Sequence, residues 1–562
     1  MQLGKLSGPR PRAVSGGRDR ANAVALAALC LLLFLTFLDN TIVSVGLGSL
    51  QTDLQASVAE LQWVIGAYAL TFAAIMLACG MIGDEFGRKK VMLSGAGVFC
   101  AGSVLCALAP NPDTLIAGRA IMGFGAAASE PGTLSVIRHI YTDTRERAWA
   151  IGVWAAVSGV ALALGPVIGG AIVGAWSWRG IFWFNLVFGL AALIAAAVTV
   201  PESSDPTAAR VDTLGTVLGA GALAALMFAI IDAEESGYGA TEVIVLLCVA
   251  VVLAVAFVAW ERRAAHPLLD LRFFRLPWFT VPNIVAFCTY LATFAIFFFT
   301  ALYLVEVLSD SGYKIALVFA PMTVLMIIGS LFAGYWTGRA GPRWPITTGC
   351  ATFAAGLLIA APLVTQHPDY VGLSLALGLA GIGIGITVVP VTSAVLDTVP
   401  PERSGMAASA ANTSREIGAV AGASILGALV FSQLSSTLNS HIEALHVSAA
   451  DKATIMGFKP FIIKVIETGQ IDKYLAQYSS QRGLVAQVEG AAYAAFGDGL
   501  HAAFYLSAGL VIAAGLLAAF TLGNKPPANA DATEESPTEV LNWTPRPVRA
   551  TRVVTFVGRP QG

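Results

Sequence analysis

The sequence predicts an all-α integral membrane protein, and three observations support this fold class. Of the 562 residues, 56% are hydrophobic and 12% are charged, a balance at which a chain in water would precipitate. Fourteen apolar runs recur along the chain, most of them near the length of about 20 residues that a helix needs to cross a bilayer. Lysine and arginine gather in alternate connections between these runs. The net charge of -2 gives no basis for binding nucleic acid.

The runs divide the chain into five parts. A basic tail, predicted to be disordered, covers residues 1–21, and a polar tail of the same kind covers residues 523–562. The first six runs form a predicted N-terminal bundle over residues 22–200, with spans at 22–46, 61–82, 91–109, 114–137, 149–174 and 180–200. Segment 201–279 holds two further helices with charged linkers, at 213–232 and 242–260. The last six runs form a C-terminal bundle over residues 280–522, with spans at 280–305, 313–335, 345–364, 370–396, 405–430 and 499–522.

The distribution of positive charge predicts the orientation. With an even number of spans and both termini in the cytoplasm, most of the 33 lysines and arginines fall on the cytoplasmic side, whereas the short outer loops hold Arg179 and Lys314. We therefore expect a multi-pass protein of the cell inner (plasma) membrane with both termini cytoplasmic. The long outer loop 432–498 either lies on the membrane surface as short helices or packs on the outer mouth.

The fifth run contains a glycine-rich stretch, residues 159–174. Small residues four apart, as at Gly165 and Gly169, let a second helix approach closely, and a membrane helix tolerates Pro166. Helix packing alone is one interpretation of this stretch. A Gly-Pro kink followed by a glycine pair also resembles the antiporter signature on the fifth helix of exporters of the major facilitator superfamily.

The connection after the second run has a specific spacing, with Gly80, Asp84, Gly87 and Arg88. Asp84 is suited to accept hydrogen bonds from helix N-terminal amides or from an arginine, and the basic residues suit the inner headgroups. A positive anchor alone would not explain the glycine and aspartate spacing, which resembles the loop between helices two and three of the same superfamily. A weaker echo lies at residues 334–343, as an internal repeat requires. There Gly338 stands where the family often has Asp, which predicts a weaker latch in the second half.

Among the charged residues inside predicted spans are Asp39 in the first and Arg119 in the fourth. An unpaired charge in a bilayer costs roughly 3 kcal/mol or more, so each should face a cavity or a partner. From the helical rise, Arg119 lies about 10 Å and Asp39 about 7 Å outward of the helix midpoints, and we expect them to pair. A static salt bridge between two helices is the structural alternative.

Glu130 follows Arg119 by three helical turns and so lies on nearly the same helix face. A buried carboxyl suits a group that must load and release a proton near neutral pH. A local hydrogen bond near the inner leaflet explains the residue equally well.

In the second half, Arg415 and Glu416 lie near the middle of a span, and Glu306 lies near the outer end of another. Glu416 or Glu306 would serve as a second proton or cation site, although the position of Glu306 favours contact with outer water.

Three further motifs extend the resemblance over nearly the whole membrane part. The segments 400–418 and 267–271 and the pair Trp178-Arg179 are similar to the fourteen-spanner drug:proton antiporters of the major facilitator superfamily, as is the segment around Asp39. Met122 departs from that pattern, because the family usually has Gln there. The resemblance implies the major facilitator fold, with two six-helix bundles plus two inserted helices and 14 transmembrane helices. It also implies proton-coupled efflux of amphipathic or cationic compounds by alternating access.

The resemblance and the residue chemistry together assign candidate roles. The proton-coupling candidates are Asp39, Arg119, Glu130 and Glu416. The gating candidates are Gly80, Asp84, Gly87, Arg88, Gly159, Gly165, Pro166, Gly169 and Gly170. The candidates for a substrate cavity are Asn40, Met122, Glu306, Asn412 and Arg415.

The sequence shows no nucleophile beside a base, no metal-binding cluster and no phosphate-binding loop. We therefore expect no enzyme activity, metal or cofactor, and we expect the proton gradient to supply the energy. The expected partners are small-molecule substrates, protons and the lipid bilayer, and the protein is expected to be a monomer. Two alternatives stay open. One is a dedicated exporter of a single metabolite or self-made antibiotic, and the other is a non-transporting membrane scaffold.

Overall fold

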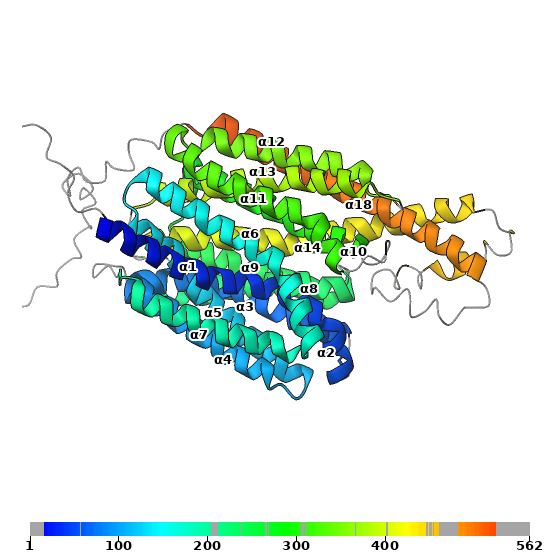
Figure 1. Cartoon of the computed structure of the whole chain (residues 1–562), viewed down its shortest axis with the longest axis horizontal. Coiled ribbons are helices and arrows are strands. Elements are labelled where there is room, and N and C mark those ends of the chain that lie inside the picture. The colour runs from blue at the N-terminus through cyan, green and yellow to red at the C-terminus, as the bar shows by residue number, and fades with distance from the viewer. Residues whose placement is uncertain are drawn as a thin grey trace, which may run out of the picture.

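The computed structural model describes residues 16–56, 58–203, 212–237, 239–264, 269–304, 312–365, 367–400, 403–445 and 482–523, with a few shorter stretches between residues 267 and 463. These residues form helices and connections, and no strand occurs among them (Figure 1). Nearly all of both predicted tails, and Glu306, lie outside the described residues. Residues 16–21, predicted as part of the basic tail, instead begin the first helix.

The first half of the chain contains six long helices at the predicted positions. They are α1 (Gly16–Ile42), α3 (Val58–Phe86), α4 (Arg88–Ala107), α5 (Pro112–Ile140), α6 (Thr144–Ala175) and α7 (Arg179–Thr199). A 3-10 segment, η1 (Val43–Gly46), and a short helix, α2 (Leu47–Leu54), join α1 to α3. The inserted pair follows as α8 (Thr213–Ser236) and α9 (Thr241–Glu261).

The second half contains six more long helices, again at the predicted positions. They are α10 (Pro277–Leu302), α11 (Gly312–Ala340), α12 (Arg343–Ala360), α13 (Tyr370–Asp397), α14 (Ser404–Ala444) and α18 (Arg482–Thr521). Two 3-10 segments, η2 (Phe273–Arg275) and η4 (Ala361–Leu363), lie in the connections before α10 and after α12.

Fourteen helices in the described part of the chain thus have 18 residues or more. By length and hydropathy, ten segments are apolar enough to span a membrane, or eleven if one bent pair counts as a span. The α5 helix is not among the ten, and it carries Arg119 and Glu130, which lower its mean hydropathy. The count of fourteen spans therefore stays a prediction, while the all-helical membrane fold is confirmed.

The predicted outer loop 432–498 is helical at both of its ends, which corrects the expected boundaries. The α14 helix continues to Ala444 and α18 begins at Arg482, so these helices have 41 and 40 residues. At about 1.5 Å per residue each is about 60 Å long, twice the thickness of a bilayer core. The two helices therefore project together beyond the bundle (Figure 1), and His441 contacts Asp498 at 2.9 Å in this extension.

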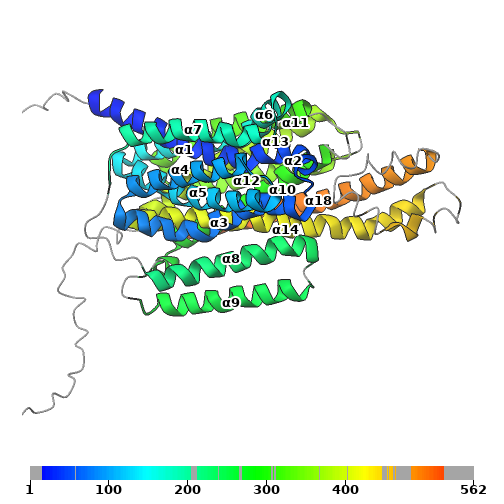
Figure 2. The same ribbon diagram turned by 90° about the horizontal axis from the view of Figure 1, so that it is seen from below.

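The two halves meet most extensively along two helix pairs. The α6 helix packs on α11, and α3 packs on α14. The inserted helices α8 and α9 lie side by side as a separate layer, with α8 against both α3 and α14 (Figure 2). The chain's first and last described helices, α1 and α18, begin and end at one end of the bundle, which we call the termini end (Figure 1).

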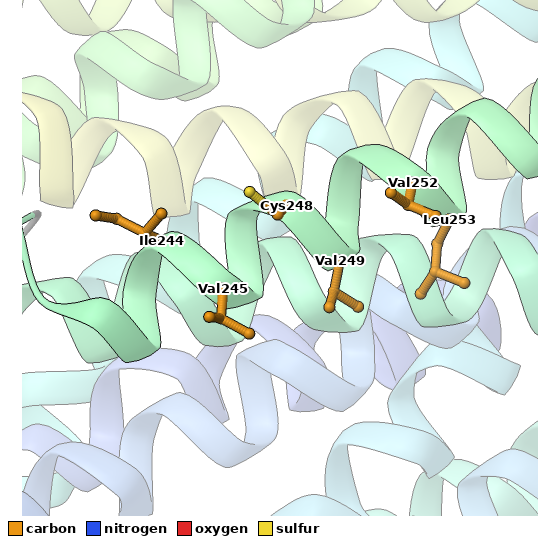
Figure 3. Close-up of a pocket in the computed structure, with 6 residues that line it drawn as sticks. All are labelled: Ile244, Val245, Cys248, Val249, Val252 and Leu253. Carbon is orange, nitrogen blue, oxygen red and sulfur yellow. The ribbon is translucent and has the colours of Figure 1, made fainter.

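The outer face of α9 is a lipid-facing surface. It carries a shallow apolar pocket (Figure 3), lined by Ile244, Val245, Cys248, Val249, Val252 and Leu253. Five of these side chains are aliphatic and the sixth is a free thiol, so the pocket offers no charged or strongly polar group to a ligand. This pocket matches the apolar surface that a bilayer requires, and it lies away from the charged residues of the interior.

Tight glycine contacts hold the interior helices together, and Gly125 of α5 shows how close they are. A Cβ atom added there would lie 2.4 Å from the backbone nitrogen of Phe99 on α4, closer than any real contact. Gly97, also on α4, has open space around it instead.

We therefore predict that Gly125→Val separates α4 from α5 and destabilises the protein by about 1–3 kcal/mol, the usual cost of overpacking. The measurement is the melting temperature of the purified protein in detergent. Gly97→Val is the matched control and should melt near the wild-type temperature. Equal melting temperatures for the two variants would contradict the packing described.

Candidate functional site

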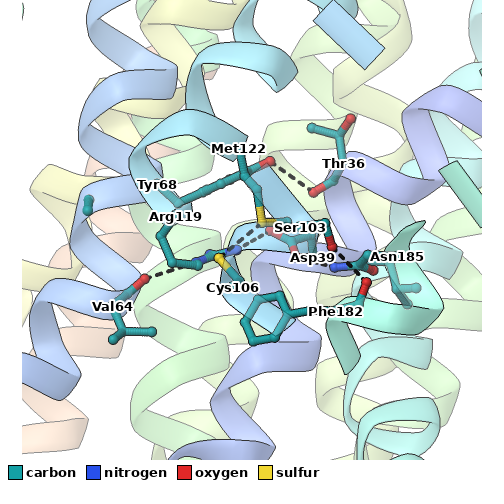
Figure 4. A network of polar contacts seen from close by, with 12 residues as sticks. Thr36, Asp39, Val64, Tyr68, Ser103, Cys106, Arg119, Met122, Phe182 and Asn185 are labelled. Carbon is teal, nitrogen blue, oxygen red and sulfur yellow. Dashed lines mark hydrogen bonds and ion pairs between the residues drawn. The ribbon is translucent and has the colours of Figure 1, made fainter. Parts of the chain in front are cut away.

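A buried ion pair joins α1 to α5. Nη1 of Arg119 lies 2.5 Å from Oδ2 of Asp39, and both side chains are 2% exposed or less (Figure 4). The α5 helix is fixed at its start by Asn111, whose side chain accepts a hydrogen bond from the amide of Thr114 at 2.9 Å. The structure thus brings together the two charged residues that helix depth alone predicted to pair.

Each member of this pair has a further partner (Figure 4). Nε of Arg119 donates to the carbonyl of Val64 on α3 at 2.9 Å, and its guanidinium lies 4.5 Å from the ring centre of Tyr68. The second oxygen of Asp39 accepts a hydrogen bond of 2.6 Å from the Asn185 amide of α7. Sequence reasoning missed Asn185, although a lone amide within the apolar run 180–200 was a usable signal. Four helices therefore meet around one buried carboxylate.

The glycine-rich stretch of α6 packs directly beside Asp39. A Cβ on Gly165 would lie 1.9 Å from the Thr41 hydroxyl, and one on Gly169 would lie 2.8 Å from the Ile42 carbonyl. These glycines therefore let α6 reach the turn of α1 that follows Asp39. The predicted close approach is present, and its partner is α1 of the same half.

The other gating candidates of this stretch lie elsewhere. Gly159 faces Met326 on α11 of the second half, where an added Cβ would lie 2.6 Å from the methionine methyl group. Gly170 is exposed. The helix runs unbroken through residue 166, and the side chain of Pro166 lies outside the described residues.

A second polar cluster contains Glu130 of α5. Glu130 is 3% exposed, and its Oε2 is a buried oxygen without a hydrogen-bond partner in the described structure. Arg415 and Glu416, on α14 of the other half, act on it electrostatically. The local hydrogen bond that the sequence left open is therefore not made at Oε2, and the carboxyl faces the interior between the halves.

Aromatic rings line the same interior. The guanidinium of Arg415 lies 5.7 Å from the ring centre of Trp154 on α6 and 5.5 Å from that of Tyr290 on α10. Arg415 also donates to the side-chain oxygen of Asn412 at 2.9 Å and to the Thr392 hydroxyl. Arginine, aromatic rings and carboxylates from both halves therefore meet in one region.

The remaining cavity candidates differ in position. The Nδ2 atom of Asn412 is buried and has no hydrogen-bond partner in the described structure. Asn40 is half-buried at the end of α1. Met122 packs inside the first half, with its sulfur 3.7 Å from the Cys106 sulfur, and its predicted place in the substrate cavity is not supported.

At the termini end, Asp84 of α3 caps the start of α14. Its carboxylate accepts hydrogen bonds from the amides of Gly405 at 3.2 Å and Met406 at 3.3 Å, and it pairs with Arg88 at 2.8 Å. The α14 helix has no side-chain cap of its own, so a carboxylate of the other half satisfies its first amides. An added Cβ on Gly405 would lie 2.4 Å from the Gly80 carbonyl, so only glycine permits this approach.

Gly87 completes the predicted gating loop. Its φ of +110° lies in a region that favours glycine, and it immediately precedes α4. The turn places Arg88 beside Asp84. Gly80, Asp84, Gly87 and Arg88 are thus brought together, as their spacing predicted, and their partner Gly405 became visible only in the structure.

The related contact between α6 and α11 is built differently. The amides at the start of α6 are capped by Asp143 of the same half, through hydrogen bonds to Glu146 and Arg145 that lower the pKa of Asp143. Across the halves, Arg147 pairs with Asp397 at 2.6 Å. Gly338 lets α11 approach the backbone of Arg145. The contact between α6 and α11 therefore relies on close packing and on Arg147, whereas the contact between α3 and α14 relies on the Asp84 carboxylate.

The described residues contain no cluster of three or more histidine, cysteine, aspartate or glutamate side chains suited to a metal ion. The groups that this site offers are buried carboxylates, arginines, amides and aromatic rings.

Comparison with known proteins gives a consistent result. Residues 29–423 match the Major Facilitator Superfamily. The chain is 33% identical to the multidrug resistance protein Stp of Mycobacterium tuberculosis (strain CDC 1551 / Oshkosh), over 76% of this chain and 79% of the relative. It is 31% identical to the methylenomycin A resistance protein of Streptomyces coelicolor, over 74% and 87% of the two chains. The solved structure of the proton:xylose symporter XylE has the same fold, with a TM-score of 0.57 and 13% identity over 89% and 95% of the chains.

We predict that Arg119→Met destabilises the protein by about 3–5 kcal/mol, because it leaves Asp39 charged and unpaired in the interior. The double variant Asp39→Asn/Arg119→Met should melt at a higher temperature than Arg119→Met alone. Melting temperatures in detergent measure both effects. Arg179→Met, which removes an exposed pairing with Asp53 at the opposite end, is the control and should change the melting temperature far less. Additive losses in the double variant would show that the buried pair is not coupled.

We also predict that Asp84→Asn opens the termini end, because it removes the negative charge that stabilises the N-terminus of α14 and pairs with Arg88. A cap of this kind is worth about 1 kcal/mol, so the ratio of open to closed molecules should rise about fivefold. Spin labels on exposed Lys90 of α4 and Trp344 of α12, in a background without native cysteines, report the distance between the halves. Asp369→Asn is the control, because Asp369 caps its own helix α13. The capping assignment is wrong if the two variants give the same distance distribution.

Proposed function

Because the chain belongs to the major facilitator superfamily, a family of membrane transporters, we propose that it exports amphipathic, often cationic, small molecules in exchange for protons. The observation that carries this proposal is that relatives named for multidrug or antibiotic resistance match about three quarters of the chain. The buried carboxyl groups of the interior supply the chemistry that proton coupling requires. A scaffold without transport would not need them.

Alternating access follows from the contacts between the halves. The hydrogen bonds from one half to the other gather at the termini end, at Asp84, Arg138 and Arg147. The positive charge pattern of the sequence supports a cytoplasmic location for that end and for both termini. In that orientation the described conformation is closed toward the cytoplasm. Opening inward requires these contacts to break as the halves rock.

Two carboxyl positions are suited to couple protons to this movement. Asp39 is held by Arg119 and Asn185 within the first half, so its protonation would release Arg119 from an ion pair. Glu130 faces Arg415 and Glu416 of the second half, so its charge state affects the attraction between the halves. A proton, or the positive group of a bound substrate, stabilises a buried carboxylate that lacks a hydrogen-bond partner.

Energetics favour the use of more than one carboxyl group for cationic substrates. One charge crossing about 100 mV provides roughly 2.3 kcal/mol, and one pH unit adds about 1.4 kcal/mol. One proton thus sustains a gradient of about 500-fold for a neutral substrate. Exchange of one proton for one monovalent cation is electroneutral, which leaves only the pH term, about tenfold. Strong export of cations therefore requires two protons.

A dedicated exporter is the second candidate function. It is favoured by relatives named for resistance to a single antibiotic, such as the puromycin resistance protein of Streptomyces alboniger. Such a protein would use the same helices, carboxyl groups and closure. In both cases we propose that the protein acts as a monomer in the inner membrane, with the proton gradient as its energy source and without a cofactor or nucleic acid.

We predict that several chemically unrelated cationic drugs release protons from energised inverted vesicles that contain the protein. Asp39→Asn and Glu130→Gln should each lower this drug-dependent proton release tenfold or more, because each removes a group that exchanges a proton. The measurement is the fluorescence of a pH-sensitive dye, with a neutral drug in parallel to test the stoichiometry argument. The control is Asp369→Asn, which changes a carboxylate outside the interior.

The responses separate the candidates. A response to one compound alone would favour the dedicated exporter. No response to any compound, from vesicles that contain folded protein, would contradict multidrug efflux and leave the dedicated exporter of a compound outside the panel, with the scaffold next.

A further inference from the structure

The inserted pair α8 and α9 covers the interface between α3 and α14, where the two halves meet at the termini end. We call this interface the seam, and the contact of Asp84 with α14 the gate. The α8 helix packs against both α3 and α14, the two helices joined by Asp84 (Figure 2). On the α3 side, the rings of Trp63 and Phe228 are 4.7 Å apart. On the α14 side, Ser424 donates to the Ile230 carbonyl at 3.5 Å. A change in the angle between α3 and α14 therefore requires α8 to move against at least one of them.

The linker after α9 is fixed to both the inserted pair and the first half. The amide of Leu269 donates to the carboxylate of Glu261, at the end of α9, at 3.2 Å. The Leu269 side chain packs on Phe257 of α9, which also contacts Met81 of α3, close to the gating loop. The next residue, Asp270, is therefore held in place by the chain around it.

Asp270 joins this linker to the start of α14. It is 4% exposed, and its Oδ2 accepts a hydrogen bond of 2.6 Å from Nη1 of Arg403. Arg403 is the N-cap residue directly before α14, and the amides capped by Asp84 follow two and three residues later. Arg272 also binds the Asp270 carboxylate, but its side chain is 78% exposed.

The Asp270 carboxyl is charged at every physiological pH. Burial acts to raise its pKa, but hydrogen bonds from Arg272 and Arg403 outweigh burial, and the pKa falls to about 2. Because this pKa lies below its ordinary value of about 3.9, the stabilisation is complete above about pH 4 and is lost only as the pH falls toward 2.

We propose that Asp270 is a positioning residue for the contact between Asp84 and the start of α14. It fixes Arg403, and with it the first turn of α14, in the place where Asp84 binds. The inserted helices thereby favour closure of the termini end. This inference rests on the alternating access described under Proposed function. It assigns the inserted pair a mechanical role, in which the linker and α8 hold α14 against α3.

The test compares variants of this linker contact by the distance between spin labels on Lys90 and Trp344. Asp270→Asn and Arg403→Gln should each raise the ratio of open to closed molecules about threefold, a change expected for a partly exposed ion pair. Arg403→Lys, which keeps the charge, should restore most of the wild-type ratio. Arg272→Gln is the matched control, because Arg272 binds the same carboxylate from within the linker.

Two outcomes overturn the inference. These are an unchanged ratio in both Asp270→Asn and Arg403→Gln, and an equal shift in Arg272→Gln. If one variant does not fold, the other still decides. Proton release by the wild type is measured separately, so a failure of the transport proposal is distinguished from a failure of the linker contact.

Discussion

The closed arrangement of the two halves depends on how the first amides of α14 find hydrogen-bond acceptors. The first amides of any helix need acceptors, and α14 has no side-chain cap of its own. Asp84 supplies one carboxylate to two of these amides from the other half of the protein. A cap made within one helix stabilises that helix alone, as Asp143 does for α6. A cap made across the halves also stabilises one arrangement of the halves, and so adds to the contacts that Arg138 and Arg147 make between them.

The interior follows a second constraint, because a charge in a low-dielectric region must be paired or neutralised. Asp39 meets this constraint within the first half, through Arg119 and Asn185. Glu130 does not meet it through hydrogen bonds at Oε2 and instead faces charges on α14. One carboxyl group is therefore stabilised by its own half, and the other depends on where the second half lies. Asp39 therefore stabilises the packing of the first half, whereas the electrostatic environment of Glu130 depends on the position of the second half.

The two halves resemble one another in topology but not in the chemistry of their closure. On one side, a carboxylate, a helix terminus and paired glycines form the contact between α3 and α14. On the other side, Gly334 and Gly338 let α11 approach the backbone of α6, and Arg147 supplies a charge. The inserted helices also break the symmetry, since α8 covers only the seam between α3 and α14. The side with the carboxylate cap is thus also the side that the inserted pair reinforces.

The sequence by itself determined the positions of the long helices, because apolar runs of bilayer length have no stable alternative in lipid. It also determined the Asp39–Arg119 pairing, since a charge in a membrane needs a partner at the same depth. The sequence left the length of α14 and α18 undetermined, because residues 432–444 and 482–498 lie outside the apolar runs. The tertiary structure alone decided that Asn185 binds Asp39, that Asp84 caps α14 and that Asp270 holds Arg403. These contacts join residues between 133 and 322 positions apart in the sequence. No local sequence pattern indicates which helices are neighbours in the bundle. Local periodicity fixes where a helix forms, whereas the partner of each polar group depends on how the helices pack.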